Sequence, residues 1–131
     1  DKVYHLGDVV MGGVEGQNWF KQNWTRLNGS KRLVVGNHDD IKFLSCGGFF
    51  AKVSLWRMFP EFGLLLTHVP VHEKSAMLWG SKDAGLRNEP IQLLNVHGHI
   101  HENPSPPGSY RCVCVEQTDY TPVNIEELRI K

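Results

Sequence analysis

The segment RLVVGNHD, residues 32–39, joins a short apolar run to a polar stop, and the rest of the chain is interpreted from it. Residues 32–35 are typical of a buried β-strand, which Gly36 ends at once. The three residues after the glycine all carry groups that bind metal ions or exchange protons: Asn37, His38 and Asp39. The segment therefore predicts a strand with polar chemistry at its carboxyl end, where α/β proteins form their sites.

Three other apolar runs end in the same way. Residues 3–6 are followed by Gly7-Asp8, residues 62–67 by His68, and residues 91–96 by His97-Gly98-His99-Ile100-His101. A lone histidine is more often a core or surface residue than a metal ligand, and His97 is expected to pack or to form a hydrogen bond. Because loops at the carboxyl ends of strands converge in an open α/β sheet, four repeats of the pattern predict one metal site.

Helical patterns alternate with these runs and predict an α/β fold in a single domain over residues 1–131. Phe20, Trp24 and Leu27 form one apolar stripe of a helix over residues 15–27. A shorter helix is expected over residues 73–79, and Asp39 or Asp40 could cap a helical turn that runs to Leu44. Further strand-like runs occupy residues 49–56, 110–115, 123–125 and 128–130.

Composition excludes several classes of function. The 131 residues are 40% hydrophobic and 21% charged, and 14 acidic residues balance 14 basic ones, so the chain lacks the footprint of a protein held by nucleic acid or anionic lipid. No run of about 18 apolar residues predicts a membrane span. The three cysteines have no CxxC spacing and are expected to be reduced and to pack as apolar residues, so a cytoplasmic location is expected.

The four segments Gly7-Asp8, Gly36-Asn37-His38-Asp39, His68 and Gly98-His99-Ile100-His101 resemble, in this order, four of the five motifs of the calcineurin-like metallophosphoesterases. The resemblance implies a sandwich of two packed mixed β-sheets with helices outside. It further implies a metal-dependent phosphoester hydrolase, a phosphodiesterase or phosphatase, in which a hydroxide that bridges two divalent metal ions attacks phosphorus.

The resemblance also assigns roles to residues. Asp8 would bridge the two ions, and His101 would bind the first. The second would be held by Asn37, His68 and His99. These nitrogen and oxygen ligands suit Mn²⁺, Fe or Zn²⁺, of which Mn²⁺ is the expected ion. His38 would stabilise charge on the phosphoryl group and protonate the leaving group, and Asp39 would orient His38 or cap the following helix.

The fifth motif, an Asp-x-His on the first strand, is absent, and the run that begins at Val3 matches the second strand of the family. We expect the parent gene to encode this motif upstream of Asp1, within roughly 30–50 further residues that form a strand and a helix.

The substrate is expected to be a small phosphoester such as a nucleotide. Val9-Val10 stands where protein phosphatases of the family carry an Asp-Arg pair, and Asp39 stands where they carry Glu. Met77 and Trp79 would wall the substrate pocket or pack in the core. Two alternatives remain at this point: a catalytically inactive scaffold of the same fold, and a purely structural metal site.

Overall fold

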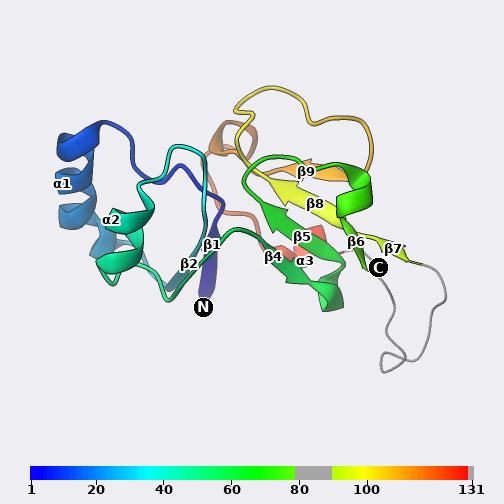
Figure 1. Ribbon diagram of the computed structural model, residues 1–131, viewed down its shortest axis with the longest axis horizontal. Coiled ribbons are helices and arrows are strands. Elements are labelled where there is room, and N and C mark those ends of the chain that lie inside the picture. The colour runs from blue at the N-terminus through cyan, green and yellow to red at the C-terminus, as the bar shows by residue number, and fades with distance from the viewer. Residues whose placement is uncertain (79–89, 130–131) are drawn as a thin grey trace.

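Two packed β-sheets form the centre of the structure, a computed structural model that describes residues 1–78 and 90–129 (Figure 1). The first is parallel, in the order β1-β2-β3: β1 (Lys2–His5), β2 (Ser30–Val34) and β3 (Lys52–Ser54). The second has the order β4-β5-β8-β9, with β4 antiparallel and the others parallel: β4 (Arg57–Phe59), β5 (Leu64–Thr67), β8 (Leu94–His97) and β9 (Tyr110–Cys112). The α/β prediction is confirmed, but only the second of these sheets is mixed; the first is wholly parallel within the described residues.

Apolar layers on both sides of each sheet explain the continuous hydrophobic runs of the sequence. The layer between the sheets is built around Val34 from β2 and Leu64, Leu66 and Val96 from β5 and β8. On the outer face of the first sheet, Leu33 packs against helices. On the outer face of the second, Leu65 packs against Ala76 and Leu93. All four residues of β5 are buried as a result.

The outer face of the first sheet is covered by α1 (Gly13–Asn23) and α2 (Ile41–Cys46), seen on the left of Figure 1. Phe20 and Trp24 of the predicted stripe are buried, but Leu27 is exposed because the helix continues only as a 3₁₀ turn, η1 (Trp24–Arg26), and Leu27 is extended. Asp40 is the N-cap of α2, and its side chain accepts a hydrogen bond from the backbone N–H of Phe43 at 3.1 Å.

The C-terminal half departs from prediction at two places. Instead of a helix over residues 73–79, a 3₁₀ turn, η3 (Glu73–Ser75), leads into strand β6 (Met77–Leu78), which pairs with β7 (Ile91–Gln92); residue 79 lies outside the described residues. Instead of two final strands there is a short helix, α3 (Ile125–Leu128), capped by Asn124, and residue 130 is again outside the described part.

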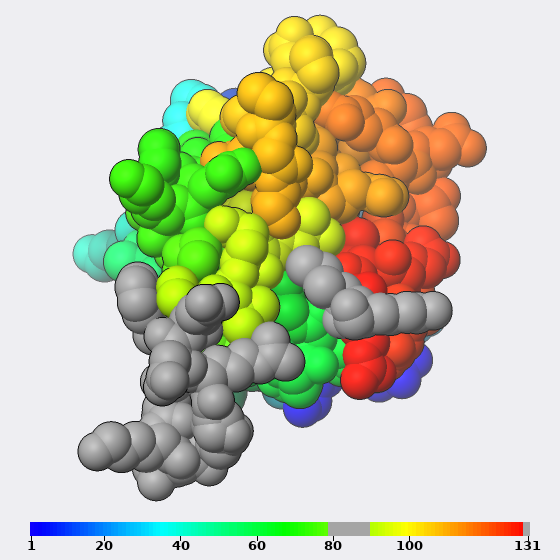
Figure 2. All heavy atoms as spheres, turned by 90° about the vertical axis from the view of Figure 1, so that its right-hand side faces the viewer, coloured from blue at the N-terminus to red at the C-terminus, as the bar shows by residue number. Residues whose placement is uncertain are grey.

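Two more 3₁₀ turns complete the secondary structure of the described residues, η2 (Pro60–Phe62) and η5 (Val115–Gln117). Segments from the second half of the chain, coloured green to red, make up most of the face seen in Figure 2. No helix in the described residues has the length and apolar character needed to cross a lipid bilayer.

Candidate metal centre

Four strand ends, two from each sheet, bring their loops together. The side chains of Asp8, after β1, and of His68 and His99, after β5 and β8, place ligand atoms within 4.8 Å of one another. His68 Nε2 lies 3.3 Å from Asp8 Oδ2 and 3.2 Å from His99 Nδ1. It also lies 2.9 Å from Oδ1 of Asn37, after β2. The four residues expected at the second ion are therefore adjacent in the structure.

The hydrogen bond on the other side of the His68 ring identifies its free lone pair. His68 Nδ1 lies 2.6 Å from the Leu6 carbonyl oxygen, which can only accept, so Nδ1 carries the proton. In the neutral imidazole, Nε2 then has a lone pair and no hydrogen. That lone pair faces the carboxylate of Asp8, the amide oxygen of Asn37 and a nitrogen of His99. Asp8, His68 and His99 could therefore hold a metal ion.

The donor set fits a divalent metal ion. Ligands held at about 2.0–2.2 Å from one ion lie about 3 Å from their neighbours, close to the separations around His68 Nε2. The partner of His68 Nδ1 is a backbone carbonyl, the usual outer partner of a ligating histidine, because it fixes the ring and its tautomer. His68 is buried, whereas Asn37 and His99 are exposed, so the centre is open to solvent on one side.

Two glycines allow the first two loops to touch. A Cβ on Gly7 would lie 2.6 Å from the backbone nitrogen of Gly36, and a Cβ on Gly36 would lie 2.5 Å from that of Asp8. Gly7 also has φ +97°, and Asp8 and His99 have φ values of +54° and +73°, a region that residues with a side chain seldom occupy. Left-handed backbone at two candidate ligands is typical of a functional site.

Asp39 joins the loops that follow β1 and β2. Its Oδ2 accepts hydrogen bonds from the backbone N–H groups of Gly36 at 2.7 Å and Asp8 at 2.9 Å, and its Oδ1 accepts from Val9 at 2.7 Å. Within the described residues the carboxylate thus holds backbone rather than the His38 ring, and the helix cap is Asp40, not Asp39. Of the two capping residues that the sequence suggested, Asp40 is confirmed, and the partners of Asp39 are backbone N–H groups of the two loops.

His38 lies at the open side of the centre. Its side chain is exposed, and its backbone N–H donates to Asp8 Oδ1 at 2.9 Å. The residue expected to act on the leaving group is therefore anchored by its amide to a ligand and leaves its imidazole accessible.

His101 is not brought into the cluster. Its ring is 70% exposed, and Nδ1 lies 3.0 Å from Oε2 of Glu116. His101, Glu102 and Glu116 form a second, wholly exposed group that could hold a metal ion. The pKa of Glu116 is lowered mainly by the hydrogen bond from its own backbone N–H and, to a smaller extent, by the hydrogen bond with His101. Sequence reasoning missed Glu116, which no motif marks.

The two remaining histidines near the centre, His97 and His5, form hydrogen bonds within the protein. His97 is fully buried: Nδ1 donates to the Gly98 carbonyl at 2.9 Å, and Nε2 lies 3.0 Å from the Ser105 hydroxyl. Burial lowers the pKa of His97, against that hydrogen bond to Gly98, which raises it. Burial likewise lowers the pKa of His5, whose Nδ1 accepts from the Gly7 N–H at 3.2 Å. The expectation that His97 forms hydrogen bonds is confirmed.

Of the two residues expected to wall a substrate pocket or to pack in the core, Met77 is half-buried in β6 and pairs with Gln92. Trp79 lies outside the described residues.

Comparisons with known proteins describe the fold and leave the activity open. No protein-family model matches the chain, and no curated protein does. The crystal structure of AQ665 from Aquifex aeolicus, a protein of unknown function, matches with a TM-score of 0.65 and 25% identity, over 98% of this chain and 74% of that one. The match supports the α/β arrangement of parallel and mixed sheets, which is compatible with a phosphoesterase-like fold.

Proposed function

We propose that this chain is a metal-dependent phosphoester hydrolase. The observation that carries the proposal is the convergence of Asp8, Asn37, His68 and His99 on the lone pair of His68 Nε2. These ligands come from four loops and leave an open side, whereas structural zinc sites are closed, tetrahedral and often contain thiolates.

Each residue of the centre has a defined part in this proposal. Asp8, Asn37, His68 and His99 would hold a divalent ion, with Mn²⁺ favoured over Fe or Zn²⁺, and the ion would supply Lewis-acid chemistry for the attack on phosphorus. The exposed imidazole of His38 would donate a hydrogen bond to the phosphoryl group and a proton to the leaving oxygen. Asp39 would keep the two loops that carry Asp8 and His38 in one position.

His101, together with Asp8, would hold a second ion. For this, the His101 side chain must reach the centre. Its Nδ1 contact with Glu116 would fix the tautomer and leave Nε2 as the ligand atom. The alternative, an inactive scaffold of the same fold, is favoured by the present position of His101 outside the cluster.

The test uses the protein with its encoded N-terminus. We would strip it of metal with a chelator, reload it with Mn²⁺, and measure the metal content and the hydrolysis of bis(4-nitrophenyl) phosphate. His38→Ala should retain the metal and lose about 100-fold or more in kcat. His72→Ala is the matched control, because His72 is also exposed and its ring contacts the backbone of Lys74.

The outcomes separate the alternatives. Metal-dependent turnover that is lost only in His38→Ala supports the hydrolase. Equal loss of metal and turnover in His38→Ala would make His38 a ligand, contrary to the proposal. A folded, metal-loaded protein without turnover would be a scaffold.

A further inference from the structure

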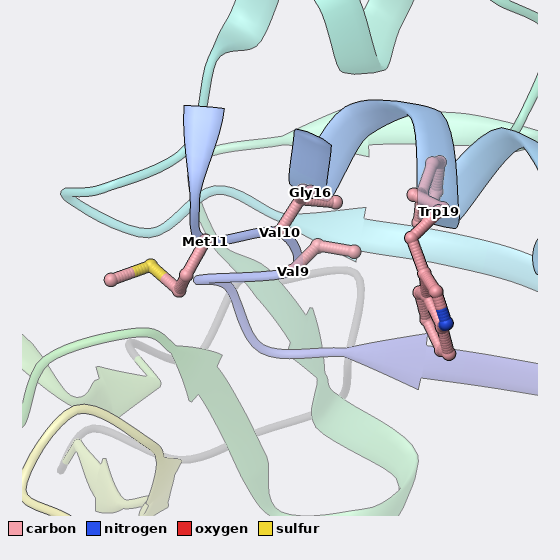
Figure 3. Close-up of a pocket in the computed structure, with 6 residues that line it drawn as sticks. Val9, Val10, Met11, Gly16 and Trp19 are labelled. Carbon is pink, nitrogen blue, oxygen red and sulfur yellow. The ribbon is translucent and has the colours of Figure 1, made fainter. Parts of the chain in front are cut away.

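A hollow of about 300 Å³ begins one residue after the candidate ligand Asp8. One wall is the segment that follows β1, and the other is the first two turns of α1, as Figure 3 shows. Six residues line the hollow: Val9, Val10, Met11, Gly16, Trp19 and Phe20. None of them carries a charge, so the hollow suits an uncharged group.

The outer part of this lining is unusually exposed for its chemistry. Trp19 is 66% exposed and Met11 is 61% exposed, whereas Trp24, one helical turn further along, is 9% exposed in the core. Exposed tryptophan and methionine side chains around a hollow are typical of a binding surface, because leaving that apolar area in water is unfavourable.

Gly16 creates the close contact between the two walls. A Cβ on Gly16 would overlap the backbone oxygen of Met11 and would lie 3.2 Å from Cγ1 of Val10. A residue with a side chain would therefore push α1 away from the segment that follows Asp8. Glycine therefore lets the helix approach this segment closely.

Two hydrogen bonds fix the hollow relative to the metal centre. Asp39 Oδ1 accepts from the backbone N–H of Val9, the first residue of the lining. Gln17 of α1 donates from Nε2 to Asp40 Oδ2 at 3.2 Å, which connects the helix wall to the loop that carries His38. Both walls of the hollow are thus bonded to the loop that carries His38.

We propose that this hollow is a subsite for the nucleobase of a nucleoside phosphoester, with Trp19 as the stacking surface. The inference rests on the proposed function, which places phosphorus at Asp8, His68 and His99. A flat uncharged base matches the apolar lining, and an exposed indole is the best stacking partner among the side chains. The volume is at the small end of ligand pockets and accommodates a single ring system.

The first experiment compares two diesters with the same leaving group, methyl 4-nitrophenyl phosphate and thymidine 5′-(4-nitrophenyl phosphate), on the Mn²⁺-loaded protein with its encoded N-terminus. The wild type should prefer the thymidine ester in kcat/KM. Trp19→Ala should lower kcat/KM for the thymidine ester about tenfold and leave the methyl ester unchanged. Trp56→Ala is the matched control, because Trp56 is also exposed, at 57%, and does not line the hollow.

The second experiment measures binding without turnover, by calorimetric titration of the Mn²⁺-loaded protein with thymidine 5′-monophosphate or inorganic phosphate. Trp19→Ala should weaken only the nucleotide, about tenfold, and Trp56→Ala neither ligand. If these affinities are found but neither ester is hydrolysed, the base subsite is supported and the proposed hydrolase activity is rejected. Equal affinities of Trp19→Ala and the wild type for the nucleotide, or equal losses on both esters, would overturn the subsite, and circular dichroism would establish that the variant is folded.

Discussion

Replacing Asp39 by alanine should destabilise the protein far more than its partial exposure indicates. The carboxylate accepts three backbone hydrogen bonds, from Gly36, Asp8 and Val9 at 2.7–2.9 Å. A hydrogen bond to a charged group contributes about 1.5–3 kcal/mol, and an amide left unpaired adds its own penalty. Because water can reach part of this site, we expect a net loss of about 3–5 kcal/mol in the free energy of unfolding for Asp39→Ala.

Asp40 provides a control at the next position. Its carboxylate is exposed and caps α2 through the Phe43 N–H, so Asp40→Ala should cost about 1 kcal/mol, the usual value for an N-cap. Asp39→Asn should fall between the two, because an amide keeps one acceptor oxygen but turns N–H donors toward at least one backbone N–H.

The differences in the free energy of unfolding can be measured by urea unfolding monitored through tryptophan fluorescence. A chelator in the buffer removes any contribution from bound metal. A domain of this size is commonly stable by about 5–15 kcal/mol, so Asp39→Ala should still fold. If Asp39→Ala proves no less stable than Asp40→Ala, the Asp39 carboxylate does not hold the two loops together.

Three further outcomes are expected. Gly36→Ala should weaken Mn²⁺ binding at least tenfold, because its Cβ would lie 2.5 Å from Asp8 Oδ1. Gly98→Ala is the control and should bind Mn²⁺ normally, because its Cβ would meet nothing closer than 3.5 Å. Equal Mn²⁺ affinities of the two variants in a titration would contradict this prediction. Iodoacetamide at pH 8 should modify only the exposed Cys46, which mass spectrometry would show. Cys112 is buried, and burial raises the pKa of Cys114 to about 11, so about one Cys114 side chain in a thousand is a thiolate at this pH. Rapid labelling of two cysteines would refute this prediction. Removing metal with a chelator should lower the Tm by a few degrees, because a bound metal ion stabilises the folded state by mass action. The circular dichroism spectrum should not change. Unfolding of the protein on metal removal would instead indicate a structural metal site.

The sequence was sufficient to predict that Asp8, Asn37, His68 and His99 lie together, because the signal is local, but it also predicted His101, which lies outside this cluster. Each of these four residues lies within three positions of the end of an apolar run. Parallel pairing of β1 with β2 and of β5 with β8 places successive strand ends at one edge of a sheet. The alternation of strands and helices likewise predicted the α/β class.

The features that the sequence did not predict depend on contacts between residues that are far apart in the chain. Two of the three backbone N–H groups that donate to Asp39 lie 30 and 31 residues away and have no signature in the sequence, whereas the third, that of Gly36, is three residues away. The partner of His101, Glu116, lies 15 residues away, and His101 itself has φ +53°, so extended spacing from His99 did not predict its direction. The helical pattern over residues 73–79 was overridden because Ala76 packs against Leu93 and β6 pairs with β7.

The apolar core and the candidate metal centre are built from different residues, which indicates what a bound metal ion would do. Three apolar clusters lie between and outside the sheets, and none includes a candidate ligand, so burial of the core does not depend on an ion. The loops are joined without one as well, through Asp39, the contact of Gly7 with Gly36, and the bond from Gly98 N–H to the His68 carbonyl at 2.8 Å. Because backbone hydrogen bonds position the candidate ligands, we expect the fold to form without the ion. The exposed side of the centre, with His38 beside it, is the part that the proposed hydrolysis would use.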